Sequence, residues 1–175
     1  MKRVKLSLLA FVCAAGALTV VVAPAGAAET QMPIVDEIDA LRQATWRWQR
    51  LMGVRQTPAL RHERWAKHEY RIWILDLWRK RAARAYHRAL RPPHRDAWRC
   101  IHRHEGAWSD PDPPYWGGLQ MDLSFQAHYG GHLLRAKGTA DRWTPIEQMW
   151  VAEKAYRSGR GFYPWPNTAR YCGLI

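Results

Sequence analysis

The first 28 residues determine the compartment in which the rest of the chain folds. A basic start is followed by an apolar run from 6 to 23 and by small residues at 25–27. This pattern is typical of a secretory signal peptide, and we expect cleavage near Ala28. The apolar run is about long enough to span a membrane, so a retained anchor is the alternative. Pro24 and the small residues favour cleavage, and we predict an exported protein, extracellular or associated with the cell wall.

Removal of residues 1–28 leaves two cysteines, Cys100 and Cys172. Exported proteins with two cysteines usually pair them, because compartments outside the cytoplasm are oxidising. In the chain-entropy model, a bond across such a long loop stabilises the fold by about 3–5 kcal/mol. Two free, buried thiols are the alternative.

Positive charge is concentrated in the first half of the exported chain. Residues 29–95 hold 15 Lys and Arg against 7 Asp and Glu, whereas residues 96–175 hold 9 against 8. For an exported protein, this charge favours an anionic cell-wall polymer or membrane surface as partner. The sequence contains no nucleic-acid-binding motif, and we expect no nucleic-acid partner.

Residues 29–92 are predicted to form a basic, Trp-rich helical hairpin. An apolar stripe predicts a helix over 34–52 that ends at Gly53, the residue type preferred just beyond a helix. Thr57-Pro58 has the N-cap and N1 pattern, which predicts a second, antiparallel helix from there to about Leu90. Its basic residues either form a solvated face or contact an anionic surface; they are Arg79, Lys80, Arg81, Arg84 and Arg88.

Residues 93–175 are predicted to form a second domain of helices and one short strand. The expected elements are a helix over 96–105, a turn over 109–114, a strand over 115–121, a helix from Phe125 that breaks at Gly130-Gly131, a helix over 144–158 and a terminal loop.

Histidine spacing gives little support for a metal site. His102 and His104 are two residues apart and would point to different sides of a helix. His128 and His132 have helical spacing, but the glycines between them weaken the helix needed to present both. We therefore expect neither a metal ion nor a cofactor.

Glu105 is the candidate catalytic residue. It is predicted at the end of a helix, next to Gly106 and close to Trp108. A carboxylic acid shielded by apolar groups resists ionising and can donate a proton to a leaving oxygen. By itself, a glutamate in this place is ordinarily a surface charge.

An ordered series of motifs extends from Trp98 to Cys172. It comprises Trp98, Cys100, Glu105-Gly106, Trp108, Tyr115-Trp116-Gly117-Gly118-Leu119-Gln120, Glu147-Gln148 and Trp165-Pro166…Cys172. With these motifs, the chain resembles the transglycosylase-like domain of resuscitation-promoting factors, in the lysozyme superfamily. The hairpin before Pro92 lies outside the resemblance.

The resemblance implies an α+β, mostly helical, lysozyme-like domain that cleaves the β-1,4 bond between N-acetylmuramic acid and N-acetylglucosamine. Glu105 matches the family's catalytic acid, Tyr115–Gln120 matches the strand that lines the glycan cleft, and Cys100–Cys172 matches the family's disulfide. Two departures stand out: Ile101–His104 separate the cysteine from the glutamate, and the threonine that often follows the strand is replaced near Phe125.

The residues expected to bind substrate surround this strand. They are Tyr115, Trp116, Gly118, Gln120, Asp122 and Trp165. Hydrolytic glycosidases normally use a second carboxylate. Asp122 either fills that role or caps the next turn, whereas Asp110 and Asp112 are expected only to form the turn. Trp108, Trp143 and Trp150 are expected in the core.

The sequence thus predicts a secreted, monomeric enzyme that cleaves peptidoglycan glycan strands with a single glutamate. It acts as a lytic transglycosylase or as a muramidase. The main alternative is a peptidoglycan-binding protein of the same fold without activity. A weaker alternative is a basic, Trp-rich module that acts on membranes.

Overall fold

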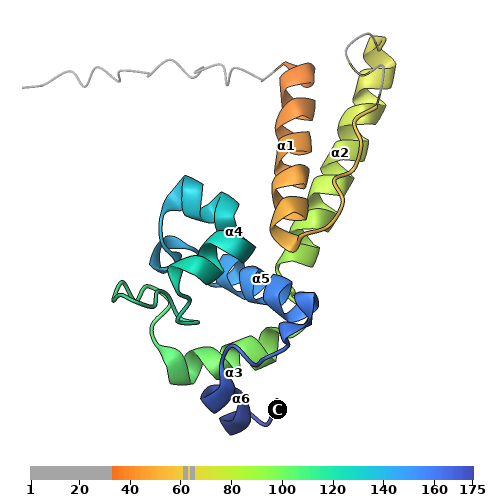
Figure 1. Cartoon of the computed structure of the whole chain (residues 1–175). Coiled ribbons are helices and arrows are strands. Elements are labelled where there is room, and N and C mark those ends of the chain that lie inside the picture. The colour runs from red at the N-terminus through yellow and green to blue at the C-terminus, as the bar shows by residue number, and fades with distance from the viewer. Residues whose placement is uncertain (1–32, 61–62, 64–65) are drawn as a thin grey trace, which may run out of the picture. The chain divides into compact units, whose positions relative to one another are not determined.

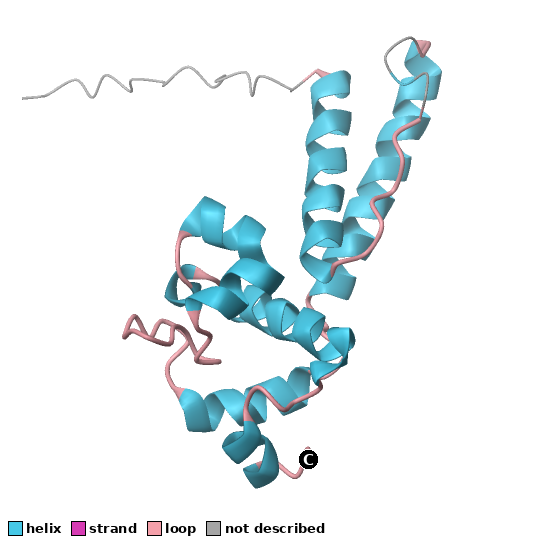
Figure 2. Cartoon of the chain, viewed as in Figure 1, coloured by secondary structure: helices cyan, strands magenta, loops and turns pink. Residues whose placement is uncertain are grey.

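The computed structural model describes residues 33–60, 63 and 66–175, and it is mostly helical (Figures 1 and 2). The predicted signal peptide lies outside the described residues. The elements are α1 (Ile34–Met52), α2 (His68–Ala89), α3 (Arg95–Glu105), α4 (Leu123–Lys137), η2 (Ala140–Arg142), α5 (Pro145–Ala155), η3 (Tyr156–Arg160) and α6 (Pro166–Tyr171). Over the described ranges, pairing of the β type is limited to one isolated bridge, between Trp116 and Met121.

The helices of the described part were also compared with the length and hydropathy that a membrane span requires. None of them is both long enough and apolar enough to cross a bilayer.

Helix α1 has the predicted bounds at its carboxyl end. Gly53 adopts a left-handed conformation (φ 65°), and its N–H donates to the carbonyl of Arg50. A residue with a Cβ is strained there, so glycine ends the helix. The predicted stripe is buried at Ile38, Thr45 and Met52.

The prediction of an antiparallel hairpin is wrong, because α2 begins at His68 and not at Pro58. The backbone of Thr57 binds α1 instead: its N–H donates to Gln49 (2.9 Å), and its carbonyl accepts from the Trp46 indole (2.7 Å). Residues 53–60 therefore return along the helices before α2 starts (Figure 1). Helix α1 is roughly 28 Å long, and roughly nine extended residues cover this distance. The connection between α1 and α2 is therefore long enough to reach back along α1.

Because of this return, α1 and α2 run parallel. Early residues of α1 contact the middle of α2, as in the ion pair between Glu37 and Arg79. Later residues of α1 contact the end of α2, as in the ring contact between Trp48 and Tyr86. We call these two helices and their connection the α1/α2 pair.

A buried glutamate holds the connection of the α1/α2 pair in place. Glu63 is 7% exposed and forms an ion pair with Arg42. Its other carboxylate oxygen accepts from the Trp78 indole (2.9 Å) and from the Leu60 N–H (2.9 Å). A small apolar core of Ile38, Ile74, Leu75 and Trp78 surrounds this network.

The remaining helices form what we call the α3–α6 region (95–171). Helix α5 begins with Thr144 as its N-cap and Pro145 in the first turn, as predicted. Thr144 and Glu147 also form a capping box. Helix α4 does not break at the glycine pair but kinks at Gly130 (φ −122°, ψ 17°). A Cβ on Gly130 would meet Trp143 at 2.7 Å, so this glycine serves close packing.

The α3–α6 region is built around an aromatic core. Trp98, Trp143, Trp150 and Trp165 are each at most 4% exposed, which confirms the core position predicted for Trp143 and Trp150. Glu153 is fully buried among them and accepts from the Trp98 indole (2.8 Å). Its carboxylate also accepts from the N–H of His94 (2.7 Å), just before α3.

The larger core extends into the α1/α2 pair, and the described residues form one compact unit. The Trp150 indole donates to the carbonyl of Ala89 (2.6 Å), and the Arg157 guanidinium donates to the carbonyl of Met52 (2.7 Å). The carboxyl ends of α1 and α2 are thereby fixed to α5 and to the turn that follows it.

Candidate active site

Glu105 is the last residue of α3, and its side chain is half-buried. The hydroxyl of Thr168 donates to its Oε1 atom at 2.7 Å. Thr168 belongs to α6, so the two ends of the α3–α6 region meet at this carboxylate. The hydrogen bond restricts the rotation of Glu105, which is a requirement for positioned acid–base chemistry.

Helix α6 is held against α3 by two further contacts. Cys100 and Cys172 form a disulfide, and the rings of His104 and Tyr171 lie 4.2 Å apart. The predicted pairing of the cysteines is thus present, although four residues separate Cys100 from Glu105. Both residues nevertheless contact α6 or its C-cap, Cys100 through the disulfide and Glu105 through Thr168.

The segment from 106 to 122, which we call the 106–122 loop, replaces the predicted strand. Trp116 and Met121 exchange two backbone hydrogen bonds (3.1 and 3.0 Å), and the residues between them form a tight turn. The glycine pair favours a turn here over an extended strand, since Gly117 has a φ of 73°. The β part of the predicted fold is therefore limited to this bridge in the described residues.

Gly118 allows the 106–122 loop to approach α3 closely, because it has no side chain. A Cβ at this position would lie 2.5 Å from Nδ1 of His102 and 2.8 Å from the Trp108 ring. Those two rings stack on each other with centroids 3.9 Å apart. Burial lowers the pKa of His102, which favours the neutral ring in this stack.

Gln120 crosslinks the 106–122 loop. Its amide donates to Oδ2 of Asp110 (2.8 Å) and to the carbonyl of Gly117 (3.0 Å). Its backbone is left-handed (φ 46°), which is uncommon for a residue with a Cβ. A Cβ on Gly106 would meet the Gln120 amide at 3.0 Å, so the crosslink lies next to Glu105.

Two predicted substrate contacts have structural roles. Asp122 is the N-cap of α4: it accepts from the N–H of Phe125 (2.7 Å), and this bond is the main reason its pKa is lowered. Trp165 is 4% exposed, and its indole donates to the carbonyl of Leu119 (2.6 Å). Asp122 is therefore a cap, and Trp165 is a core residue that anchors the loop.

The other aromatic residues of the loop are accessible to different degrees. Tyr115 is 49% exposed. Trp116 and Trp108 are half-buried and pack against the larger core. Tyr115 and Trp116 thus keep ring surface at the loop, whereas Trp108, expected in the core, lies at its margin.

The sequence prediction missed Thr168, and it named Gln148 in the motif series without predicting its role as a buried polar partner. Thr168 falls in a segment predicted as loop, although Pro166 could have indicated a helix start there. Gln148 is fully buried, and its amide donates to the carbonyls of Trp108 (2.8 Å) and Ala140 (2.8 Å). No local sequence signal distinguishes such a glutamine from an exposed one.

Possible metal ligands come together at one place in the described ranges. Atoms of Cys100, His104 and Cys172 lie within 4.8 Å of one another. Both sulfurs are used in the disulfide, and a metal ligand would have to be a thiolate.

Two cavities lie at other places on the molecule. The larger, about 640 Å³, is mainly apolar and is lined by residues of α1, α2, α4 and α5 that include Trp48, Leu133 and Ile146. The smaller, about 250 Å³, lies within the α1/α2 pair. Glu105 lines neither of them.

Comparisons of the chain with protein-family models, with curated proteins and with solved structures gave no match. The resemblance to the transglycosylase-like domain accordingly stays a prediction based on the motifs between Trp98 and Cys172.

Proposed function

We propose that the chain is an exported enzyme that cleaves the glycan strands of peptidoglycan, with Glu105 as its acid. The observation that carries the proposal is the fixed carboxylate at the end of α3, bonded to Thr168 and adjoined by the crosslinked 106–122 loop. The motif series adds the substrate class, since its elements resemble those of the transglycosylase-like domain and follow in the same order.

The proposed chemistry begins with proton transfer. Protonated Glu105 donates to the glycosidic oxygen while the bond from that oxygen to C1 of N-acetylmuramic acid breaks. The 6-hydroxyl of the same sugar attacks C1, and its proton returns to the Glu105 carboxylate. The product is a 1,6-anhydro sugar, so the enzyme is a lytic transglycosylase.

Intramolecular attack is favoured over hydrolysis because two aspartates that could serve as a second carboxylate have structural roles. Asp122 caps α4. Asp110 accepts from the Gln120 amide (2.8 Å) and from the N–H of Asp112 (3.2 Å). A hydrolytic mechanism with two carboxylates would use one of these structural groups or the exposed Asp112.

Exposed rings of the loop supply the proposed glycan contact. Tyr115 offers an open ring, and Trp116 offers the accessible part of its indole. Sugar rings present apolar C–H faces that pack on aromatic rings. Gly118 and Gln120 act through the shape of the loop in this proposal.

The test is the Glu105→Gln variant, assayed by mass spectrometry of muropeptides released from purified peptidoglycan. Wild type is expected to release anhydro-muropeptides, and the variant to release them about 10²–10⁴-fold more slowly. Asp112→Asn is the matched control, because it removes an exposed carboxylate of the same loop. Reducing ends in place of anhydro ends would establish hydrolysis instead.

A peptidoglycan-binding protein without turnover is the second candidate, favoured by the hydrogen bond that the Glu105 carboxylate already accepts from Thr168. In that case, wild type binds peptidoglycan sacculi and releases no product, and Glu105→Gln changes neither result. Equal product release by wild type and by Glu105→Gln would refute the proposed role of this residue.

A further inference from the structure

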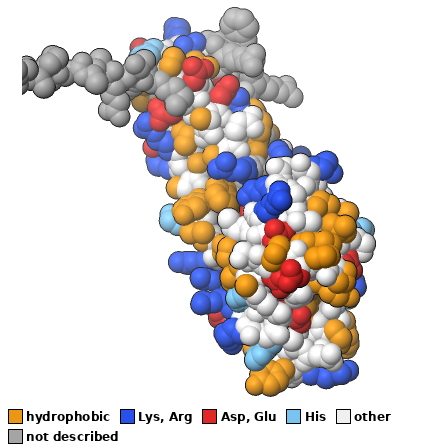
Figure 3. Space-filling model, turned by 90° about the vertical axis from the view of Figure 1, so that its left-hand side faces the viewer, with side chains coloured by type: hydrophobic (Ala, Val, Ile, Leu, Met, Phe, Trp, Pro, Cys, Tyr) orange, Lys and Arg blue, Asp and Glu red, His pale blue; other side chains and the backbone are white. Residues whose placement is uncertain are grey.

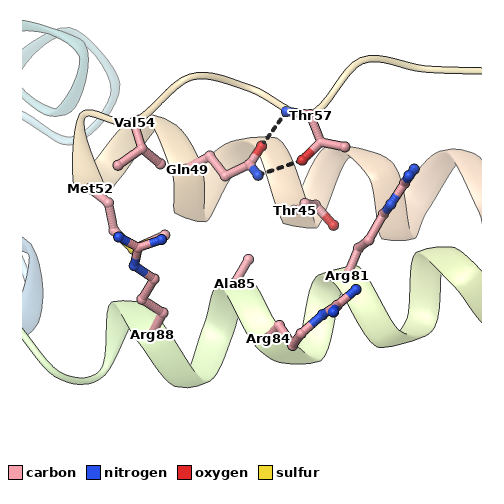
Figure 4. Close-up of a pocket in the computed structure, with 9 residues that line it drawn as sticks. All are labelled: Thr45, Gln49, Met52, Val54, Thr57, Arg81, Arg84, Ala85 and Arg88. Atoms are coloured by element: carbon pink, nitrogen blue, oxygen red, sulfur yellow. Dashed lines mark hydrogen bonds between the residues drawn. The ribbon is translucent and has the colours of Figure 1, made fainter.

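The smaller cavity lies between α1, α2 and the segment that follows α1 (Figure 4). Its volume of about 250 Å³ is below the range of about 300–1,000 Å³ that is usual for drug-sized ligands. It suits a small group better than an extended substrate.

Three arginines of α2 line this cavity: Arg81, Arg84 and Arg88. Their spacing of three and four residues sets them on one face of the helix. In Figure 4, Arg81 and Arg88 reach from α2 toward α1. The cavity is therefore bordered by three positive charges from a single helix face.

These arginines have no carboxylate partner within the described part of the chain. Arg81 instead lies over the Trp78 ring, 4.7 Å from its centroid, and its Nη1 atom is buried without a hydrogen-bond acceptor. A buried donor without an acceptor carries a free-energy cost, which an anion in the cavity would remove.

The wall formed by α1 and the segment after it carries polar side chains that hydrogen bonds hold in place. Gln49 and Thr57 hydrogen bond to each other through their side chains (2.7 Å), and the Thr45 hydroxyl donates to the carbonyl of Leu41 (2.8 Å). Among the residues that the structure describes, no acidic side chain lines the cavity. Arg84 and Arg88 are exposed, so a ligand can reach the site from solvent.

We propose that this cavity is a binding site for a phosphate group, held by Arg81, Arg84 and Arg88. Guanidinium groups match the geometry of phosphate oxygens and remain charged at all physiological pH values. The group is either free inorganic phosphate or a phosphodiester of an anionic polymer. The site is independent of Glu105 and of the proposed cleavage reaction.

The test is isothermal titration calorimetry of the purified protein in chloride buffer, with inorganic phosphate and with a glycerol-phosphate oligomer as separate probes. We expect saturable binding of at least one probe, and weakening as salt rises. Tighter binding of the oligomer identifies a polymer phosphodiester, and tighter binding of phosphate identifies the free ion. Both results support phosphate recognition.

Single variants then locate the site. Arg84→Gln and Arg88→Gln are each expected to weaken binding about tenfold, because each removes a charge-assisted hydrogen bond. Lys80→Gln is the matched control: it removes one positive charge from the same helix, outside the cavity, and is expected to change binding less than about twofold.

Three results would overturn the proposal. They are no binding of either probe, equal weakening by Lys80→Gln and by the arginine variants, and equal binding of acetate at the same concentration. The second would mean that only the general positive charge of α2 attracts anions. Glu105→Gln is expected to retain phosphate binding, which separates this test from that of the enzyme.

Discussion

The α1/α2 pair and the α3–α6 region share one structural feature, which lies in different surroundings in each. Each buries one glutamate that accepts a hydrogen bond from a tryptophan indole: Glu63 from Trp78 and Glu153 from Trp98. Glu63 sits in a connecting segment beside a small apolar core, whereas Glu153 sits within a helix inside the large aromatic core.

This difference in surroundings predicts how easily each region opens locally. In the α1/α2 pair, large hydrophobic side chains such as Tyr70, Ile72 and Trp73 are about half exposed at the start of α2. Few apolar contacts there support the buried carboxylate, so local opening is expected to be easy. In the α3–α6 region, the packed rings of the larger core support Glu153, and the disulfide holds α6 against α3. On the face in Figure 3, hydrophobic and basic side chains are interspersed.

The largest expected effect on stability comes from removing the disulfide. The cysteines are 72 residues apart, so the Cys100→Ser/Cys172→Ser variant is expected to lose about 4 kcal/mol of unfolding free energy. Urea denaturation measures the loss. Amide hydrogen exchange should rise first in α6; faster exchange confined to α1 and α2 would contradict the assignment of the bond to the α3–α6 region.

Glu153→Ala is expected to cost about 3 kcal/mol, because it leaves the Trp98 indole and the His94 N–H without their acceptor. Glu63→Ala is the matched variant, and it should cost about 2 kcal/mol because water reaches the connecting segment more easily. Limited proteolysis distinguishes them: Glu63→Ala should increase cleavage between 53 and 67 alone. Global unfolding by both variants would remove the contrast between the regions.

Gly118→Ala is expected to cost about 1–3 kcal/mol, because the added methyl group overlaps His102 and Trp108. Thermal unfolding and the near-ultraviolet dichroism of the tryptophans report the disturbance. Gly131→Ala is the control within the same region, since its nearest neighbour is the flexible end of Arg135 at 3.5 Å. A stable Gly118→Ala protein with wild-type spectra would mean that the loop is not closely packed.

The smallest effect concerns pH. Burial, and then the charge of Arg157, lowers the pKa of Lys154 to about 8 from 10.5. Between these values the unfolded chain binds more protons than the folded chain, so the unfolding free energy rises with pH there. The rise should stay below about 1 kcal/mol per pH unit. Lys154→Met should abolish this slope in denaturation experiments at pH 7–10; an unchanged slope would assign it to another group.

Sequence reasoning succeeded where the signal is local. Gly53 and the Thr144-Pro145 pair mark helix ends through the backbone chemistry of those residues alone. The cysteine pair was expected from composition and from the resemblance, and it is present. Glu105 was correctly predicted at a helix end, but its catalytic role stays a prediction.

Predictions failed where distant partners compete with local preference. Thr57-Pro58 has helix-start chemistry, yet the Thr57 backbone donates to Gln49 and accepts from Trp46. These bonds fix Thr57 in the return segment, and α2 runs in the opposite direction to the one predicted. Trp165 was expected at a cleft because aromatic rings suit sugars, but its indole bonds the carbonyl of Leu119 inside the core. Neither partner can be identified from sequence spacing.

The contact between Thr168 and Glu105 sets an order of events during synthesis. Thr168 follows Glu105 by 63 residues, so α3 leaves the ribosome before the hydroxyl that orients its last residue has emerged. Glu105 therefore acquires its partner only after α6 has also been synthesised. A chain truncated before α6 would carry the carboxylate without this hydroxyl, which makes synthesis through α6 a condition for assembling this corner of the molecule.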